Sequence, residues 1–123
     1  MASKKILVVD DSETVLMMEK WILNGDGYEV VTARDGREGV AKALELKPDL
    51  ILMDVLMPQM NGFEAVKHLR QEQETRSVPI LMVTNQVQEE CMETGYESGC
   101  SDYIIKPIDR LELLTKVRSF LDE

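Results

Sequence analysis

The sequence predicts an α/β fold in which an open parallel sheet carries helices on both faces. Five short apolar runs, rich in Val and Ile, are too short for helices. Apart from the second, they are nearly continuous rather than alternating, which is typical of strands buried on both faces. Stretches with helical spacing lie between them, and right-handed crossovers place such helices on both sides of a sheet. The predicted strands are Ile6–Val9, Tyr28–Thr32, Leu50–Met53, Ile80–Val83 and Tyr103–Ile105.

The stretches between and after the strands carry apolar stripes at positions three or four apart, as amphipathic helices do. These stripes are Val15, Met18 and Ile22; Val40, Ala43 and Leu44; Phe63, Val66 and Leu69; and Leu113, Leu114, Val117 and Leu121. Three of the helices begin with a capping pattern, namely Asp35 with Glu38, Asn61 with Glu64 and Asp109 with Glu112. The segment 87–97 is the weakest predicted helix, because Gly95 lies inside it.

Length and charge narrow the classes of protein to consider. The chain has 123 residues, which predicts a single domain over residues 1–123. Its net charge of −9 repels nucleic acid and anionic membranes, so we expect neither as a direct partner. Since no apolar run has the length of a membrane span and no signal region is evident, the expected location is cytoplasmic. Cys91 and Cys100 lack a metal-site spacing, and we expect reduced thiols.

Chemically reactive side chains follow four of the five predicted strands. Asp10 and Asp11 close the first strand, Asp54 the third and Thr84 the fourth, and the fifth leads into Lys106. In a parallel sheet all of these strand ends share one edge, where ligands of such sheets bind. The sequence therefore predicts three carboxylates, one hydroxyl and one ammonium group at a single site.

The charges of this site require a partner. Two carboxylates about 4 Å apart repel by roughly 4 kcal/mol at an effective dielectric constant of about 20. Three carboxylates against Lys106 leave two uncompensated negative charges, so either one carboxyl is protonated or a divalent cation binds. Mg²⁺ suits the site because it prefers oxygen ligands and often joins a phosphate group.

Four segments together resemble response-regulator receiver domains of two-component systems. They are V-V-D-D-S at 8–12, L-M-D-V-L-M-P-Q-M-N-G at 52–62, M-V-T-N at 82–85 and D-Y-I-I-K-P at 102–107, and the resemblance covers essentially the whole chain. It implies a flavodoxin-like doubly wound sheet with strand order 2-1-3-4-5. That order places the first and third strands side by side, so that Asp10, Asp11 and Asp54 can share one metal ion.

The resemblance also implies a role for each residue. Asp54 would accept a phosphoryl group from a sensor histidine kinase, a histidine phosphotransfer protein or a small acyl phosphate. Asp11, Asp54 and the backbone carbonyl of Leu56 would hold Mg²⁺ directly, and Asp10 would act through a bound water. Lys106 and Thr84 would contact phosphoryl oxygens. The family usually has the Lys-Pro peptide bond before Pro107 in cis.

Signalling is implied by the same resemblance, which describes a phosphorylated regulator rather than an enzyme. Thr84 would move toward the phosphoryl group and Tyr103 would fill the space, remodelling the face formed by the fourth helix, the fifth strand and the last helix. The target would be a downstream protein or an output domain, and a homodimer formed on phosphorylation stays open. Asn85 stands where the family usually has a small residue, and the bulky Leu56 predicts slow self-dephosphorylation.

Other interpretations of these residues remain. Asp10 and Asp11 could cap the first helix, and Tyr103 could be ordinary sheet packing. An FMN-binding flavodoxin would require phosphate-binding backbone donors where Asp10 and Asp11 stand, and a haloacid-dehalogenase-type phosphatase would require Asp in place of Leu56. A degenerate receiver that acts only as a binding module would not need Asp54 or Lys106. His68, the sole histidine, is expected on the surface.

Overall fold

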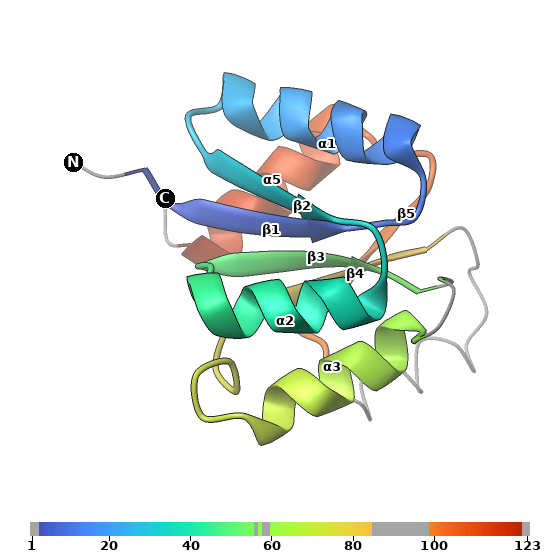
Figure 1. Ribbon diagram of the computed structural model, residues 1–123. Helices are drawn as coiled ribbons and strands as arrows, with labels where there is room; N and C mark the ends of the chain where they lie inside the picture. The colour runs from blue at the N-terminus through green and yellow to red at the C-terminus, as the bar shows by residue number, and fades with distance from the viewer. Residues whose placement is uncertain (1–2, 56, 58–59, 85–98, 122–123) are drawn as a thin grey trace.

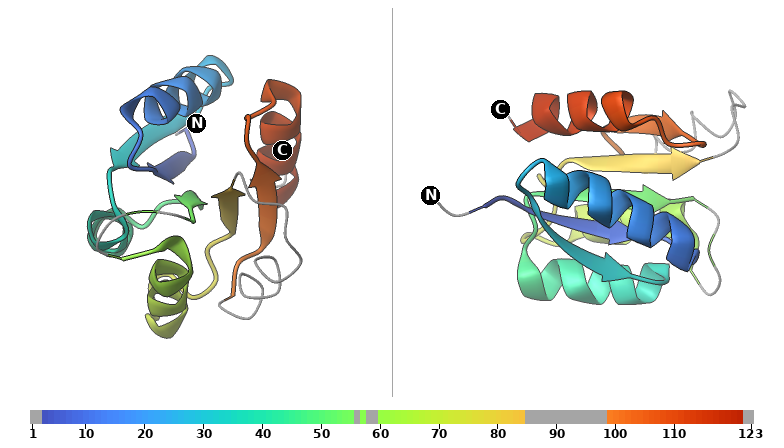
Figure 2. Two further views of the ribbon diagram at one scale, coloured as in Figure 1. Left: turned by 90° about the vertical axis from the view of Figure 1, so that its right-hand side faces the viewer. Right: turned by 90° about the horizontal axis from the view of Figure 1, so that it is seen from above.

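The computed structural model describes residues 3–55, 57, 60–84 and 99–121. Strands β1 (Lys5–Val9), β2 (Glu29–Ala33), β3 (Leu50–Asp54), β4 (Ile80–Thr84) and β5 (Asp102–Ile105) form one parallel sheet in the order β2-β1-β3-β4-β5. The arrowheads of the strands all point the same way (Figure 2). The predicted fold class and strand order are therefore confirmed, and each predicted strand boundary lies within one residue of the observed one.

Helices cover both faces of this sheet (Figure 1). Helices α1 (Glu13–Gly25) and α5 (Arg110–Leu121) pack on one face, and α2 (Gly36–Leu46) and α3 (Gly62–Gln71) pack on the other. Each face has its own apolar cluster, because alternate residues of the buried strands point to opposite sides. The segment 87–97, including Gly95, and Cys91 lie outside the described residues. Within those residues, no helix is long and apolar enough to span a bilayer.

The capping predictions are confirmed at three helix starts. Asp35 accepts a hydrogen bond from the backbone N–H of Glu38 at 2.8 Å, and Asn61 accepts one from Glu64 at 2.9 Å. Asp109 accepts from Leu111 at 2.8 Å and from Glu112 at 3.3 Å. Each cap satisfies N–H groups that a helix leaves without an internal partner.

The apolar stripe predicted for α1 is wrong at two of its three positions. Val15 is only partly buried and Met18 is 37% exposed. The buried face of α1 instead consists of Leu16, Glu19, Ile22 and Leu23. Because a glutamate occupies one position of this face, the sequence pattern favoured the neighbouring stripe. The other stripes are confirmed, with Leu44 and Phe63 partly buried at their margins.

Glu19 is a carboxylic acid inside the apolar core. It is 1% exposed, and its Oε2 atom has no hydrogen-bond partner within the described residues. Burial, followed by the negative charge of Asp10, raises the pKa of Glu19 to about 8, while Lys106 opposes the shift. A carboxylate is costly to bury without a partner, so Glu19 carries a proton at neutral pH.

Replacing Glu19 by glutamine should flatten the dependence of stability on pH. The pKa of Glu19 is higher in the folded state than in the unfolded state. The free energy of unfolding is therefore unaffected by Glu19 below about pH 4.5 and falls as the pH rises toward 8. The loss is about 1.4 kcal/mol per pH unit over that window, a few kcal/mol in all. Urea unfolding at several pH values should therefore show that the advantage of Glu19→Gln over wild type grows between pH 5 and pH 8. The exposed Glu45→Gln is the control, and parallel curves for Glu19→Gln and wild type would contradict the assignment.

Candidate functional site

The carboxyl ends of the strands bring the predicted site residues together. Asp10 and Asp11 follow β1, Asp54 ends β3 and Thr84 ends β4. In the register of the sheet Val9 pairs with Met53, which places Asp10 beside Asp54. Lys106 follows β5, and its backbone N–H donates to the carbonyl of Thr84 at 2.7 Å. The structure therefore brings Asp10, Asp11, Asp54 and Lys106 together at this edge of the sheet.

Three carboxylates form the centre of this site. Asp10, Asp11 and Asp54 each offer an oxygen atom, and these atoms all lie within 4.8 Å of one another. Asp10 and Asp54 are 1% and 5% exposed, whereas Asp11 is exposed to solvent. A set of oxygen donors that is partly buried and open on one side suits a hard divalent cation that retains water ligands, as Mg²⁺ does. The residues present therefore fit the ion that the sequence implied.

Lys106 provides the positive charge of the site. Its Nζ atom lies 3.1 Å from Oδ2 of Asp10 and 3.4 Å from Oδ1 of Asp54. Burial alone lowers the pKa of this ammonium, but the hydrogen bond to Asp10 and the charge of Asp54 raise the pKa above its usual value. Lys106 is therefore a fixed cation between the two buried carboxylates.

The surroundings of Asp54 affect its protonation. Burial, followed by the charge of Asp10, raises the pKa of Asp54 to about 6, although Lys106 acts in the opposite direction. At neutral pH Asp54 is mostly ionised, so the carboxylates repel one another at close range. A cation bound at this point would relieve that repulsion and keep Asp54 in the anionic form that a nucleophile needs.

The helix-capping interpretation of Asp10 and Asp11 is replaced by a different arrangement. Ser12 is the N-cap of α1, and its hydroxyl oxygen accepts from the N–H of Val15 at 3.3 Å. Oδ1 of Asp10 accepts from the N–H of Ser12 at 2.8 Å, while its Oδ2 faces Lys106. Asp10 is thus held by the turn between β1 and α1 and by Lys106 at the same time.

The two predicted switch residues are buried in neighbouring strands. Thr84 is 2% exposed and Tyr103 is 4% exposed, and Tyr103 pairs with Met82 in the sheet. Tyr103 packs in the apolar cluster beneath α2 and α3, so its ring is already buried in this structure. The peptide bond between Lys106 and Pro107 is cis, as the family resemblance implied. Leu56 and Asn85 lie outside the described residues.

Two further features near the site were missed by sequence reasoning. A Cβ atom on Gly62 would lie 2.2 Å from the backbone oxygen of Asp54, so only glycine lets α3 begin this close to β3. Glu19 contributes a carboxyl group to the electrostatic surroundings of Asp10 and Asp54. The Asn61-Gly62 pair after the third strand could have indicated that α3 begins close to this strand. No sequence pattern indicated that Glu19 lies on the buried face of α1. His68 is exposed, as expected, and Cys100 is buried.

Comparisons with known proteins agree with this geometry. Residues 6–118 match the family model of the response regulator receiver domain. The chain is 39% identical over 117 residues to the protein PilH of Pseudomonas aeruginosa, which covers 95% of this chain and 97% of PilH. It is 42% identical over 119 residues to the regulator PhoP of Bacillus subtilis and spans about half of that longer protein, 49%.

Solved structures show the same fold. The chemotaxis protein CheY4 of Vibrio cholerae is 39% identical, with a TM-score of 0.92 and coverage of 97% of this chain and 99% of CheY4. The receiver domain of the sensor histidine kinase PA1611 from Pseudomonas aeruginosa is 30% identical, with a TM-score of 0.92 over 99% of this chain and 100% of that domain; it carries a magnesium ion in its active-site cleft. Fold, site and comparisons agree, and the chain belongs to the response regulator receiver domain family.

Proposed function

We propose that this protein is a phosphorylatable switch of a two-component system and that Asp54 accepts the phosphoryl group. The observation that carries the proposal is the position of Asp54, whose carboxylate lies beside Asp10, Asp11 and Lys106 at the edge of the sheet. Family membership favours this function over flavin binding or phosphatase activity. The whole of residues 1–123 acts as one receiver domain in this proposal.

Mg²⁺ would be held by Asp11, Asp54 and the backbone carbonyl of Leu56, with Asp10 acting through a water molecule. The ion supplies positive charge that offsets the carboxylates and the incoming phosphoryl oxygens. The clustering of the three carboxylates supports this ligand set. The magnesium ion in the cleft of the PA1611 receiver domain supports it as well.

In the proposed phosphoryl transfer, Asp54, Lys106 and Thr84 would act from the positions that they have in this structure. One carboxylate oxygen of Asp54 attacks phosphorus, a new O–P bond forms, and the bond from phosphorus to the histidine nitrogen of a kinase or phosphotransfer protein breaks. Lys106 stands 3.4 Å from Asp54 and would pair with a transferred oxygen, and Thr84 would hydrogen-bond another. Positioning and charge compensation, rather than covalent chemistry by other groups, would supply the catalysis.

The phosphorylated state would act on partners through a change of surface. An aspartyl phosphate carries about one more negative charge than Asp54 and adds acceptor oxygens, which would draw Thr84 toward it. Tyr103 would adjust in the space beside Thr84 and alter the face of β5, α5 and the fourth helix. We infer a cytoplasmic protein that receives the group from a sensor histidine kinase and acts on a downstream protein or output domain. A homodimer of the phosphorylated form is a further outcome of this proposal.

Mass spectrometry after treatment with acetyl phosphate tests the acceptor directly. Wild-type protein with Mg²⁺ should gain the mass of one phosphoryl group, and the gain should be lost when Mg²⁺ is chelated. Asp54→Ala should show no gain, because the nucleophile is absent. Asp49→Asn is the matched control, since Asp49 precedes the opposite end of the same strand. Phosphorylation of Asp54→Ala at the wild-type level would exclude Asp54 as the acceptor.

Tyr103→Ala separates signalling from chemistry. The variant should be phosphorylated to the wild-type extent, because Tyr103 contributes no group to the transfer. It should lose the phosphorylation-dependent change in amide hydrogen exchange at β5 and α5, and with it binding to downstream partners. Tyr103→Phe retains the ring and should behave as wild type if packing carries the signal. An unchanged exchange response in Tyr103→Ala would remove Tyr103 from the switch.

A further inference from the structure

Arg70, in the last turn of α3, is a partly buried cation whose donors bind backbone oxygen atoms. Its Nη1 atom donates to the carbonyl of Thr75 at 3.1 Å, to that of Arg76 at 3.0 Å and to that of Val78 at 2.6 Å. Within the part of the chain that the structure describes, no carboxylate forms an ion pair with Arg70. The rigid fork of guanidinium donors therefore holds the loop between α3 and β4.

The same guanidinium group reaches the residues that lead into β5. Its Nε atom donates to the carbonyl of Gly99 at 2.8 Å, and Nη2 lies 3.5 Å from Oγ of Ser101. Oγ of Ser101 also accepts from the N–H of Ile80, the first residue of β4, at 3.1 Å. The N–H of Ser101 donates to the carbonyl of Ile80 at 2.7 Å. Arg70 and Ser101 together therefore join α3, β4 and the start of β5.

The conformation of Gly99 shows how closely the chain passes over Arg70. A Cβ atom on Gly99 would lie 2.8 Å from Cγ of Arg70, and φ of Gly99 is +106°, which L side chains rarely adopt. Glycine at this position thus lets the backbone approach the aliphatic stem of Arg70 and offer its carbonyl to Nε.

β5 is the strand of the sheet whose end carries Lys106. It has four residues, and among the described strands it pairs with β4 alone. The ammonium group that follows it lies 3.1 Å from Asp10 and 3.4 Å from Asp54. Because the strand is short and extended and has a neighbour on one side, a shift of its start displaces its end. The position of the Lys106 ammonium therefore depends on what holds β5 at the other end.

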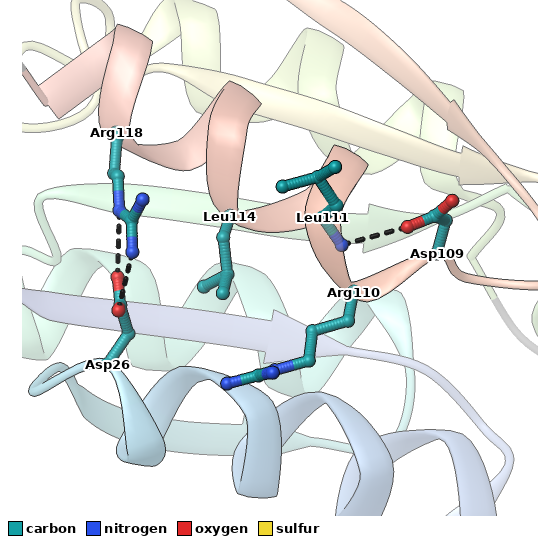
Figure 3. Close-up of a pocket in the computed structure, with 6 residues that line it drawn as sticks. All are labelled: Asp26, Asp109, Arg110, Leu111, Leu114 and Arg118. Carbon is teal, nitrogen blue, oxygen red and sulfur yellow. Dashed lines mark hydrogen bonds and ion pairs between the residues drawn. The ribbon is translucent and has the colours of Figure 1, made fainter.

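Helix α5 holds the first half of β5 from the side. Lys116 donates to the carbonyl of Tyr103, and its Nζ atom lies 3.5 Å from Oδ2 of Asp102. α5 is itself tied to the end of α1 by Arg118, whose Nη2 atom lies 2.7 Å from Oδ1 of Asp26 (Figure 3). These contacts hold residues 102 and 103, whereas Arg70 holds the residues that precede them.

We propose that Arg70 is a positioning residue for phosphoryl transfer, which fixes the start of β5 and thereby keeps the ammonium group of Lys106 between the two buried carboxylates. Arg70 lies at the edge of the sheet where β4 and β5 begin, and Lys106 lies at the edge where they end. Arg70 therefore acts through β5 and touches no reacting atom. This inference rests on the proposed function, in which Asp54 accepts the phosphoryl group.

Arg70→Met tests the proposal, because it keeps an aliphatic stem beside Gly99 and removes every donor. The rate of modification by acetyl phosphate at saturating Mg²⁺, followed by mass spectrometry, should fall roughly three- to tenfold, since a displaced Lys106 compensates the transferred oxygens less well. The Kd for Mg²⁺, from calorimetric titration, should stay at the wild-type value, because the proposed ligands follow β1 and β3. In the unphosphorylated protein the backbone N–H of Lys106, which donates to Thr84, should exchange faster than in wild type.

Two further variants separate positioning from loss of stability. Thr75 is buried in the same loop, and its hydroxyl donates to the carbonyl of Leu69 at 2.5 Å without reaching β5. Thr75→Val should therefore lower the urea midpoint and leave the rate of modification unchanged. In a Lys106→Ala background, Arg70→Met should cause no further loss of rate, because the group that it positions is absent. If circular dichroism shows that Arg70→Met does not fold, Ser101→Ala takes its place under the same criteria.

Four results would overturn the inference. They are a wild-type rate in Arg70→Met, an equal loss of rate in Thr75→Val, an equal loss in the Lys106→Ala background, and a weaker Kd for Mg²⁺ that accounts for the whole loss. Absence of modification in the wild-type protein would instead be a failure of the proposed function. Hydrogen exchange at Lys106 needs no phosphorylation, so unchanged exchange in Arg70→Met would still show that Arg70 does not fix β5.

Discussion

Repulsion among three carboxylates is the constraint on which this protein depends. Asp10, Asp11 and Asp54 have oxygen atoms within 4.8 Å of one another, and Lys106 is the cation held between two of them. With all three carboxylates ionised, two negative charges are uncompensated. Each close pair costs on the order of 4 kcal/mol at an intermediate dielectric. Burial, followed by the negative charge of Asp10, raises the pKa of Asp54 to about 6.

The sheet keeps these groups together in spite of their repulsion. β3 and β4 are buried along their whole length, and an apolar cluster on each face fixes them between helices. Because close-packed strands resist small displacements, the buried carboxylates of Asp10 and Asp54 stay close to one another. Gly62 lets α3 begin against the backbone of Asp54, and this contact limits movement of the Asp54 backbone toward α3. Packing of the core thus maintains a cluster of carboxylates that suits a divalent cation.

Much of the fold and the membership of the site could be predicted from the sequence, because both follow from strand order. Buried parallel strands are recognisable as short apolar runs, and the residues that close them must share an edge. For this reason the sequence predicts that Asp10, Asp54 and Lys106 lie together. The exposed Trp21 side of α1 was not predicted, since the exposure of a helix face depends on how the helix is rotated against the sheet. The buried face of α1 was predicted wrongly because it includes Glu19, whereas the prediction assumes that a buried helix face is apolar. Distances of a few ångströms determine the capping role of Ser12, the ion pairs of Lys106 and the pKa of Asp54. The spacing of residues in the sequence does not give these distances.

The effect of Mg²⁺ on stability tests the central claim most directly. An ion that binds the folded state alone stabilises it by an amount set by its concentration relative to its Kd, about 2.7 kcal/mol at a hundredfold excess. Urea unfolding of the unphosphorylated protein should show a midpoint that rises with Mg²⁺ for wild type. The rise should be much smaller for Asp11→Asn, which removes an exposed carboxylate of the cluster without disturbing the core. An unfolding midpoint that does not change with Mg²⁺, or that rises equally in both proteins, would contradict the account.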